Sequence, residues 1–194
     1  MKLTVLFLAA VVFTTVLFTG CEEDPATPPQ NTNPQELITT MRLSLVDTSN
    51  SANTANAQFR DIDGPGGNPP VLDTLRLTPG TTYSCTLLLL DESRAPVDTI
   101  SNEVAEENLA HRIWFTPGGG VSTRMTVVAN DEDDGVPPLP IGLATIISVS
   151  AGGSALGTYR AVLKHYVPES IKRSDSDGSL GESDVDVVFP IMIQ

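Results

Sequence analysis

From Glu36 onward the chain consists of short apolar segments separated by turn-forming residues. Val, Ile, Leu and Thr dominate the segments, and Gly, Pro, Asn and Asp lie between them. This pattern is typical of β-strands joined by turns. The strands that it predicts span residues 37–46, 56–61, 71–77, 81–91, 110–116, 122–129, 142–150, 157–166 and 184–193.

Helical periodicity is scarce in the same region. Residues 97–108, which include Glu103, Glu106 and Glu107, fit a short helix, and the fifteen prolines and fifteen glycines leave little room for more. Strands at intervals of roughly ten to twenty residues with turn chemistry between them predict an all-β domain, an antiparallel β-sandwich.

A weak internal echo bears on the domain organisation. An acidic turn, a glycine and a double proline follow one another in residues 59–70 and again in residues 129–138. The echo is a hint of two similar β halves joined near residues 117–120, whereas a single β-sandwich domain over residues 36–194 is the leading expectation.

The first twenty residues have a different pattern. Lys2 is the only charged residue before Cys21, and residues 3–18 are apolar except for three threonines. A short positive start followed by an apolar run predicts a secretory signal peptide. Because the run approaches the ~20 residues that span a bilayer, an uncleaved membrane anchor is the alternative.

The end of the run, Leu17-Phe18-Thr19-Gly20-Cys21, resembles a bacterial lipobox. The resemblance implies that a lipid is attached to the Cys21 thiol, that residues 1–20 are removed and that the new N-terminus is acylated. A multiply acylated cysteine anchors a protein stably, because each buried methylene contributes ~0.8 kcal/mol. Membrane attachment through Cys21 is therefore expected.

Residues 21–35 contain four prolines and no large apolar residue, so they predict an extended tether between the lipidated cysteine and the domain. The acidic cluster at residues 22–24 resembles the surface-export signal of Bacteroidetes lipoproteins, and a solvated linker is the alternative. The expected location is the outer membrane or cell surface of a Gram-negative bacterium.

Charge and cysteine content narrow the classes of partner. Loss of Lys2 with residues 1–20 takes the formal charge from −13 to −14, which disfavours nucleic acid and favours divalent cations. With Cys21 lipidated, Cys85 has no disulfide partner. It is expected to pack as a small buried hydrophobe, with a reactive thiol as the alternative.

Two further resemblances concern the domain itself. Residues 77–83, Leu-Thr-Pro-Gly-Thr-Thr-Tyr, resemble the tyrosine corner of fibronectin type III domains, which implies that the Tyr83 hydroxyl bonds back to the main chain and has a structural role. The mature chain is similar to small lipoproteins of Bacteroidetes. The similar pieces are the lipobox, residues 59–64, the glutamate-rich stretch leading to residues 111–115, and residues 184–190.

Three acidic loops are candidate calcium sites. Carboxylates at alternate positions followed by glycine let several oxygens converge on a hard cation. Asp and Gly are also ordinary turn residues, so simple turns are the alternative. The candidate ligands are Asp61, Asp63, Asp131, Asp133, Asp134, Asp175 and Asp177.

No catalytic motif is evident. His111 and His165 both fall on predicted strands, where partly exposed positions on a sheet face are expected, and two imidazoles this far apart in sequence form no metal motif. Residues 153–157 lack the spacing of a nucleophile elbow, and no glycine loop with a lysine cradles phosphate. No catalytic residue is therefore predicted.

The sequence thus favours a lipid-anchored, non-enzymatic binding or structural module of the cell envelope that needs no cofactor. The alternative is a lipoprotein that binds calcium or a small ligand through the acidic loops, and a hydrolase comes third. A protein or glycan partner is compatible with all three, and the sequence names none.

The lipobox leads to a direct prediction. Cys21→Ser should abolish partitioning into the detergent phase and leave a longer, unprocessed precursor, because both lipid attachment and cleavage require the thiol. Phase partitioning and intact mass of the wild type and the variant check this. If the Cys21→Ser variant still partitions into the detergent phase and the wild type retains residues 1–20, the segment is a plain membrane helix instead.

Overall fold

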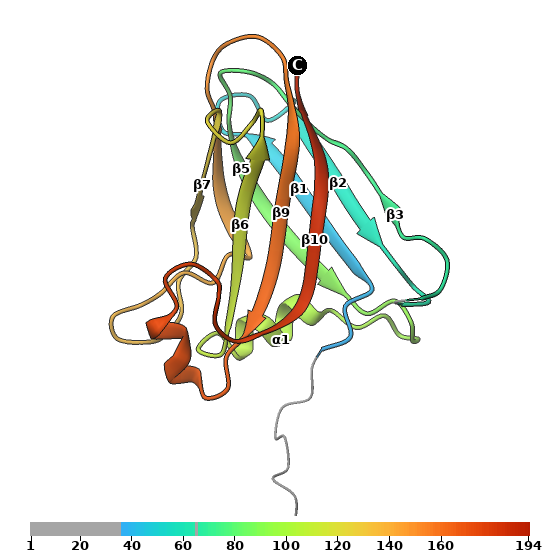
Figure 1. Ribbon diagram of the computed structural model, residues 1–194, viewed down its shortest axis with the longest axis vertical. Coiled ribbons are helices and arrows are strands. Elements are labelled where there is room, and N and C mark those ends of the chain that lie inside the picture. Colours follow the sequence, from blue (N-terminus) through green and yellow to red (C-terminus); the bar gives the residue numbers. More distant parts are fainter. Residues whose placement is uncertain (1–35, 65) are drawn as a thin grey trace, which may run out of the picture. The chain divides into compact units, whose positions relative to one another are not determined.

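The computed structural model describes residues 36–64 and 66–194, which form two β-sheets packed face to face (Figure 1). The predicted signal peptide, Cys21 and the tether lie outside the described residues. Within these ranges no helix is both long and apolar enough to cross a bilayer. The predicted all-β sandwich is confirmed.

One sheet has six strands in the order β3-β2-β1-β5-β8-β7, and the other has four in the order β4-β10-β9-β6. The strands of the larger sheet are β1 (Thr40–Asp47), β2 (Thr54–Arg60), β3 (Val71–Leu72), β5 (Thr82–Leu90), β7 (Met125–Ala129) and β8 (Ala144–Val149). Those of the smaller sheet are β4 (Leu75–Leu77), β6 (His111–Gly119), β9 (Ala155–His165) and β10 (Glu182–Ile193). Neighbours are antiparallel except for the parallel pair β4 and β10.

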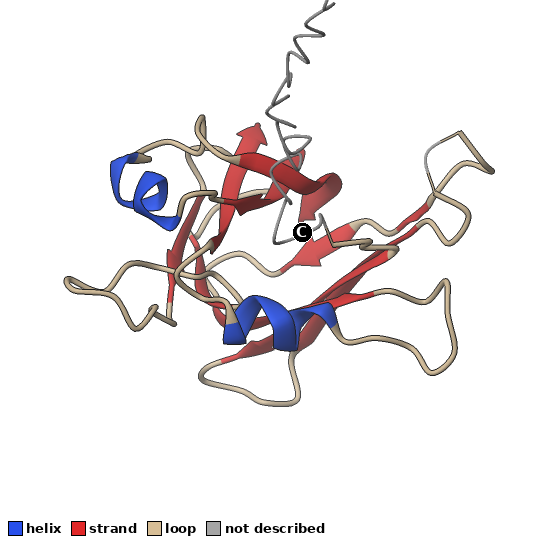
Figure 2. Ribbon diagram, turned by 90° about the horizontal axis from the view of Figure 1, so that it is seen from below, coloured by secondary structure: helices blue, strands red, loops and turns tan. Residues whose placement is uncertain are grey.

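Two short helices complete the fold. The helix α1 (Ile100–Glu106) lies within the segment predicted as helical and covers the end of the sandwich where β9 ends and β10 begins (Figures 1 and 2). The 3₁₀ helix η1 (Glu169–Ser174) connects β9 to β10 and was not expected, because one short turn leaves no periodic pattern in the sequence.

The observed strands bear on two details of the sequence-based expectations. The segment 71–77 divides into β3 and β4, which belong to different sheets, because Asp73 bonds to Gln58 and the chain then crosses to pair with β10. Residues 117–119, next to the suggested boundary between halves, are the last three residues of β6.

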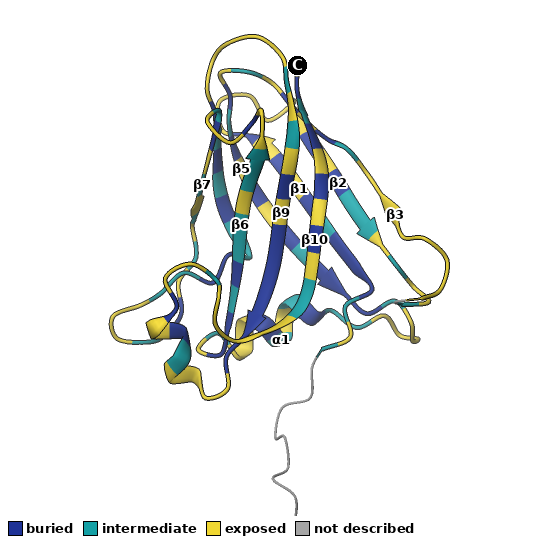
Figure 3. Cartoon of the chain, viewed as in Figure 1, coloured by how far each residue is buried: buried dark blue, intermediate teal, exposed yellow. Residues whose placement is uncertain are grey.

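The core forms between the inner faces of the two sheets. Along β5 and β10 buried residues alternate with exposed ones, as a strand with one face on the core requires (Figure 3). The final part of β9 is buried on both faces, because the segment carrying η1 folds back over the outer face of the smaller sheet. Cys85 lies in this core, where burial raises the pKa of its thiol to about 11, so the environment does not activate it as a nucleophile.

The corner before β5 is held by a tyrosine side chain. The backbone N–H of Thr78 donates a hydrogen bond of 3.0 Å to the hydroxyl of Tyr83, and the Tyr83 ring is buried in the core. This is the contact that the resemblance to the tyrosine corner implies. Tyr159 is equally buried, but its hydroxyl has no hydrogen-bond partner.

The two tyrosines form a matched pair for mutation. Tyr83→Phe should lower the free energy of unfolding by about 0.5–1.5 kcal/mol, because Thr78 N–H loses its acceptor. Tyr159→Phe should leave stability unchanged or raise it, because it removes an unsatisfied buried hydroxyl. Urea denaturation of residues 36–194 measures both, and equal effects of the two substitutions would contradict a corner held by Tyr83.

Candidate metal centre

Four ionisable side chains converge at the end of the sandwich next to α1. Glu36, His111, His165 and Asp184 each place one potential ligand atom within 4.8 Å of all the others. It is the one group of three or more such side chains among the described residues. Two imidazoles and two carboxylates form a donor set that can hold a divalent metal ion.

The two histidines are brought together by the pairing of β6 with β9. His111 is the first residue of β6 and lies opposite His165, the last residue of β9. Both side chains point to the inner face, as Ile113 and Leu163 do two residues away, and both are buried. The rings stack with centroids 4.6 Å apart and an interplanar angle of 25°.

Asp184 reaches this group through an irregularity in β10. The pairing of β10 with β9 shifts between Ser183 and Val185, so Asp184 is the extra residue of a β-bulge. Strict alternation would place it on the outer face with Asp186, which is exposed and pairs with Arg160. The bulge instead turns its carboxylate toward the histidines.

Glu36 comes from the segment that leads into β1 of the other sheet. Its side chain is only 5% exposed, and its Oε1 atom lies 3.2 Å from Nε2 of His111. Among the described residues, neither Nε2 of His111 nor the second carboxylate oxygen of Glu36, Oε2, has a hydrogen-bond partner, and both atoms are buried. The group therefore joins the two sheets.

A backbone carbonyl fixes the ring of His111. Nδ1 lies 3.1 Å from the carbonyl oxygen of Glu107, at the C-terminal end of α1. Because that oxygen only accepts hydrogen bonds, Nδ1 carries the proton and the lone pair of Nε2 in the neutral ring points into the group. An imidazole whose second nitrogen donates to a carbonyl is the usual arrangement of a metal ligand.

Without a cation the group is electrostatically strained. Both oxygens of Asp184 are buried, and neither has a hydrogen-bond partner in the described part of the chain. Burial, followed by the charge of Glu36, raises the pKa of Asp184 well above its usual range, and His111 only partly offsets this. Burial lowers the pKa of His111, but the contacts with Glu36 outweigh burial and raise it overall. Protons or a metal ion must supply the positive charge that these two carboxylates need.

The expectation of partly exposed histidines was wrong. Both rings are buried and adjacent, because the ladder between β6 and β9 places residues far apart in sequence directly opposite each other. Nothing in the sequence grouped Glu36 or Asp184 with the histidines. The available signal was a histidine at an inward-facing position on each of two strands. The sequence does not show that these two strands pair with each other.

In the acidic loops, by contrast, the carboxylates accept hydrogen bonds from nearby backbone and side-chain donors. Asp131 accepts backbone hydrogen bonds from Gly142 and Ala144, at 2.8 and 3.0 Å. Asp175 accepts bonds from the Tyr166 hydroxyl and the Gly178 N–H, at 2.7 and 2.9 Å. These are contacts of turns and loop closure.

The remaining candidate ligands follow a similar pattern. Asp63, Asp134 and Asp177 accept hydrogen bonds from Asn68, Asn108 and Ser179 respectively, while Oδ1 of Asp61 is buried without a partner. In residues 36–64 and 66–194 no three of the seven predicted calcium ligands converge as the four residues of the metal centre do. The structure therefore does not bring the acidic loops together into one site.

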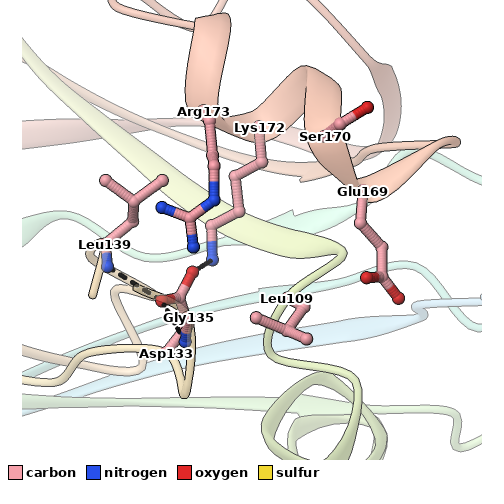
Figure 4. Close-up of a pocket in the computed structure, with 8 residues that line it drawn as sticks. All are labelled: Leu109, Asp133, Gly135, Leu139, Glu169, Ser170, Lys172 and Arg173. Atoms are coloured by element: carbon pink, nitrogen blue, oxygen red, sulfur yellow. Dashed lines mark hydrogen bonds and ion pairs between the residues drawn. The ribbon is translucent and has the colours of Figure 1, made fainter. Parts of the chain in front are cut away.

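Asp133 takes part in a buried ion pair beside a pocket of about 320 Å³ (Figure 4). Nζ of Lys172 in η1 lies 2.8 Å from Oδ2 of Asp133 and 2.6 Å from the carbonyl oxygen of Asn108, and both charged side chains are 1% exposed. The pocket is lined by two acidic and two basic residues, so it carries no net charge. Asp133 and Lys172 bind each other and Arg173 donates to the Pro137 carbonyl, so three of the four charged groups already have partners within the protein.

Burial raises the pKa of Asp133, but the bond from Lys172 and the N–H groups of Leu139 and Gly135 outweigh burial and hold it below its usual value. Burial lowers the pKa of Lys172, and Asp133 only partly offsets this. The pair is therefore a structural attachment of η1 to the loop between β7 and β8.

Comparisons with protein-family models, with curated proteins and with solved structures find no match to this chain. The fold defines an all-β sandwich, and the group of four side chains defines a candidate metal centre.

The ion pair leads to a stability prediction. Lys172→Met should lower the free energy of unfolding by about 3–5 kcal/mol, because it leaves the buried carboxylate of Asp133 without a counter-charge. Arg173→Met is the control, since the neighbouring Arg173 is exposed and bonds only to the Pro137 carbonyl, and it should cost about 1 kcal/mol or less. Chemical denaturation of residues 36–194 compares them, and similar losses in both variants would contradict the assignment.

Proposed function

We propose that this protein is a lipid-anchored binding module of the cell envelope whose β-sandwich holds one divalent transition-metal ion. The observation that carries the metal proposal is the convergence of Glu36, His111, His165 and Asp184 within 4.8 Å, with ligand atoms on three of them buried and without hydrogen-bond partners. Such atoms are costly to bury unless something binds them. A metal ion satisfies them together.

The donor set selects the class of metal. Two imidazole nitrogens and two carboxylate oxygens suit zinc and its neighbours in the transition series, whereas calcium and magnesium prefer six or more oxygen ligands. Two negative charges from the carboxylates match one divalent cation. Zinc is the representative ion, because it accepts nitrogen and oxygen ligands in a tetrahedral arrangement without redox chemistry.

The burial of the group supports a non-catalytic role. A structural zinc site is closed by four protein ligands, whereas a catalytic site keeps a position open for water and substrate. Here four protein ligands are available, and the side chains of His111 and Glu36 are 0% and 5% exposed. The module therefore binds the ion for its own structure or for capture, and the anchor at Cys21 keeps it at the membrane.

Metal titration tests the proposal on the full chain in detergent micelles. We expect one Zn²⁺ or Co²⁺ per chain and a cobalt absorption spectrum typical of tetrahedral coordination. His165→Ala should weaken binding by more than about 100-fold, because even residues that only orient ligands contribute about 10–100-fold. Competition with a chromogenic chelator measures the affinity.

Asp184 and Asp186 supply the matched control. Asp184→Asn should weaken zinc binding strongly, whereas Asp186→Asn, two residues along β10 on the outer face, should not. Calcium and magnesium at matched ionic strength test the acidic loops in the same assay. Failure to bind one zinc or cobalt ion, or equal losses in the two variants, would overturn the proposed site, and zinc-independent calcium binding would favour the loops.

A further inference from the structure

One of the four ligands differs from the others in its place in the fold. His111, His165 and Asp184 lie in paired strands of the four-stranded sheet, which the ladder holds whether or not a metal is bound. Glu36 lies outside any strand, at the start of the described chain, and leads into β1 of the six-stranded sheet. It is also the first residue after the predicted tether.

The segment containing Glu36 has few other attachments. The firm backbone contacts begin at Thr39, whose N–H donates to the Leu90 carbonyl at 3.0 Å and whose carbonyl accepts from Asp61 N–H at 2.8 Å. Residues 36–38 make no backbone hydrogen bond to another described residue. Leu37 is 49% exposed, and the side chain of Ile38 packs only partly on the core.

The polar attachment of residues 36–38 therefore depends on the Glu36 carboxylate. This carboxylate lies 3.2 Å from Nε2 of His111 and also faces Asp184, whose ligand atom lies within 4.8 Å. Two carboxylates this close in a buried site repel each other unless a positive charge lies between them. A divalent ion between them reverses the sign of the interaction, because each carboxylate then binds the ion. An ion in the site therefore adds to the contact with His111 and holds Glu36 more firmly.

We propose that the metal ion is a clamp that fixes residues 36–38, and with them the end of the tether, onto the sandwich. This inference rests on the proposed metal site. With the ion bound, the domain leaves its tether at Glu36 and the two sheets are joined through the site. Without it, the contact with His111 is the remaining polar attachment of Glu36. When that contact opens, the segment is free as far as Thr39, which adds about 10 Å of reach at about 3.3–3.6 Å for each of three extended residues.

Hydrogen exchange of the full chain in detergent micelles tests the clamp. Exchange of the amides of Leu37 and Ile38 should slow by about tenfold or more when saturating zinc replaces chelator, because the locally open state is suppressed. Peptides covering the exposed turn at residues 49–52 serve as the internal reference and should not change. Mass spectrometry of the same samples gives the number of zinc ions bound per chain.

Two variants separate a clamp from a general effect of zinc. Glu36→Ala retains three ligands, so it should bind zinc more weakly and, once saturated at higher zinc, show no zinc-dependent slowing at residues 37–38. Asp186→Asn keeps the site and should behave like the wild type.

The outcomes distinguish the two proposals. One bound zinc with unchanged exchange at residues 37–38 would overturn the clamp and leave the metal site standing. Slowing in saturated Glu36→Ala equal to that in the wild type would also overturn it, since the protection would not pass through Glu36. Absence of bound zinc in the wild type would remove both proposals together.

Discussion

The packing of one apolar face of each sheet against the other is the constraint on which the rest of the domain depends. Large buried side chains such as Tyr83, Tyr159 and Phe189 come from both sheets and meet between them. Side chains alternate between the two faces of a strand, so the register of each ladder decides which residues reach the core. A slip of one residue would turn an entire apolar face toward water.

The same alternation carries polar groups inward at one end of the sandwich. His111 and His165 occupy positions in line with Ile113 and Leu163, so the register that buries the aliphatic residues also buries the imidazoles. Burial removes the water that would otherwise satisfy them, and the domain provides two carboxylates and the Glu107 carbonyl instead. A metal centre in this place therefore needs no cleft, because it arises where the core itself becomes polar.

Much of the acidic character of the chain serves to organise loops. Asp175 accepts a hydrogen bond from Tyr166, whose hydroxyl in turn accepts one from Nε1 of Trp114, and this chain of bonds holds the segment with η1 against the smaller sheet. Asp133 and Lys172 attach the other side of the same segment. Carboxylates that look like cation ligands in sequence thus act as acceptors for backbone and side-chain donors, while the group able to hold a metal contains only two acids.

The sequence by itself determined the strands, because period-two alternation and turn residues are local properties that survive without knowledge of the partner strand. It also indicated the corner at Tyr83, a motif of seven consecutive residues, and the short helix near residues 97–108. Only the tertiary structure decided that residues 71–77 divide between two sheets, since the division depends on Gln58 and β10 as partners. The candidate metal centre was decided in the same way. Asp184 turns inward because the ladder with β9 leaves it unpaired, and Glu36 joins the group because the chain before β1 passes the opposite sheet. Pairing between distant segments determines these features. The local pattern of a single strand does not show which other strand it pairs with.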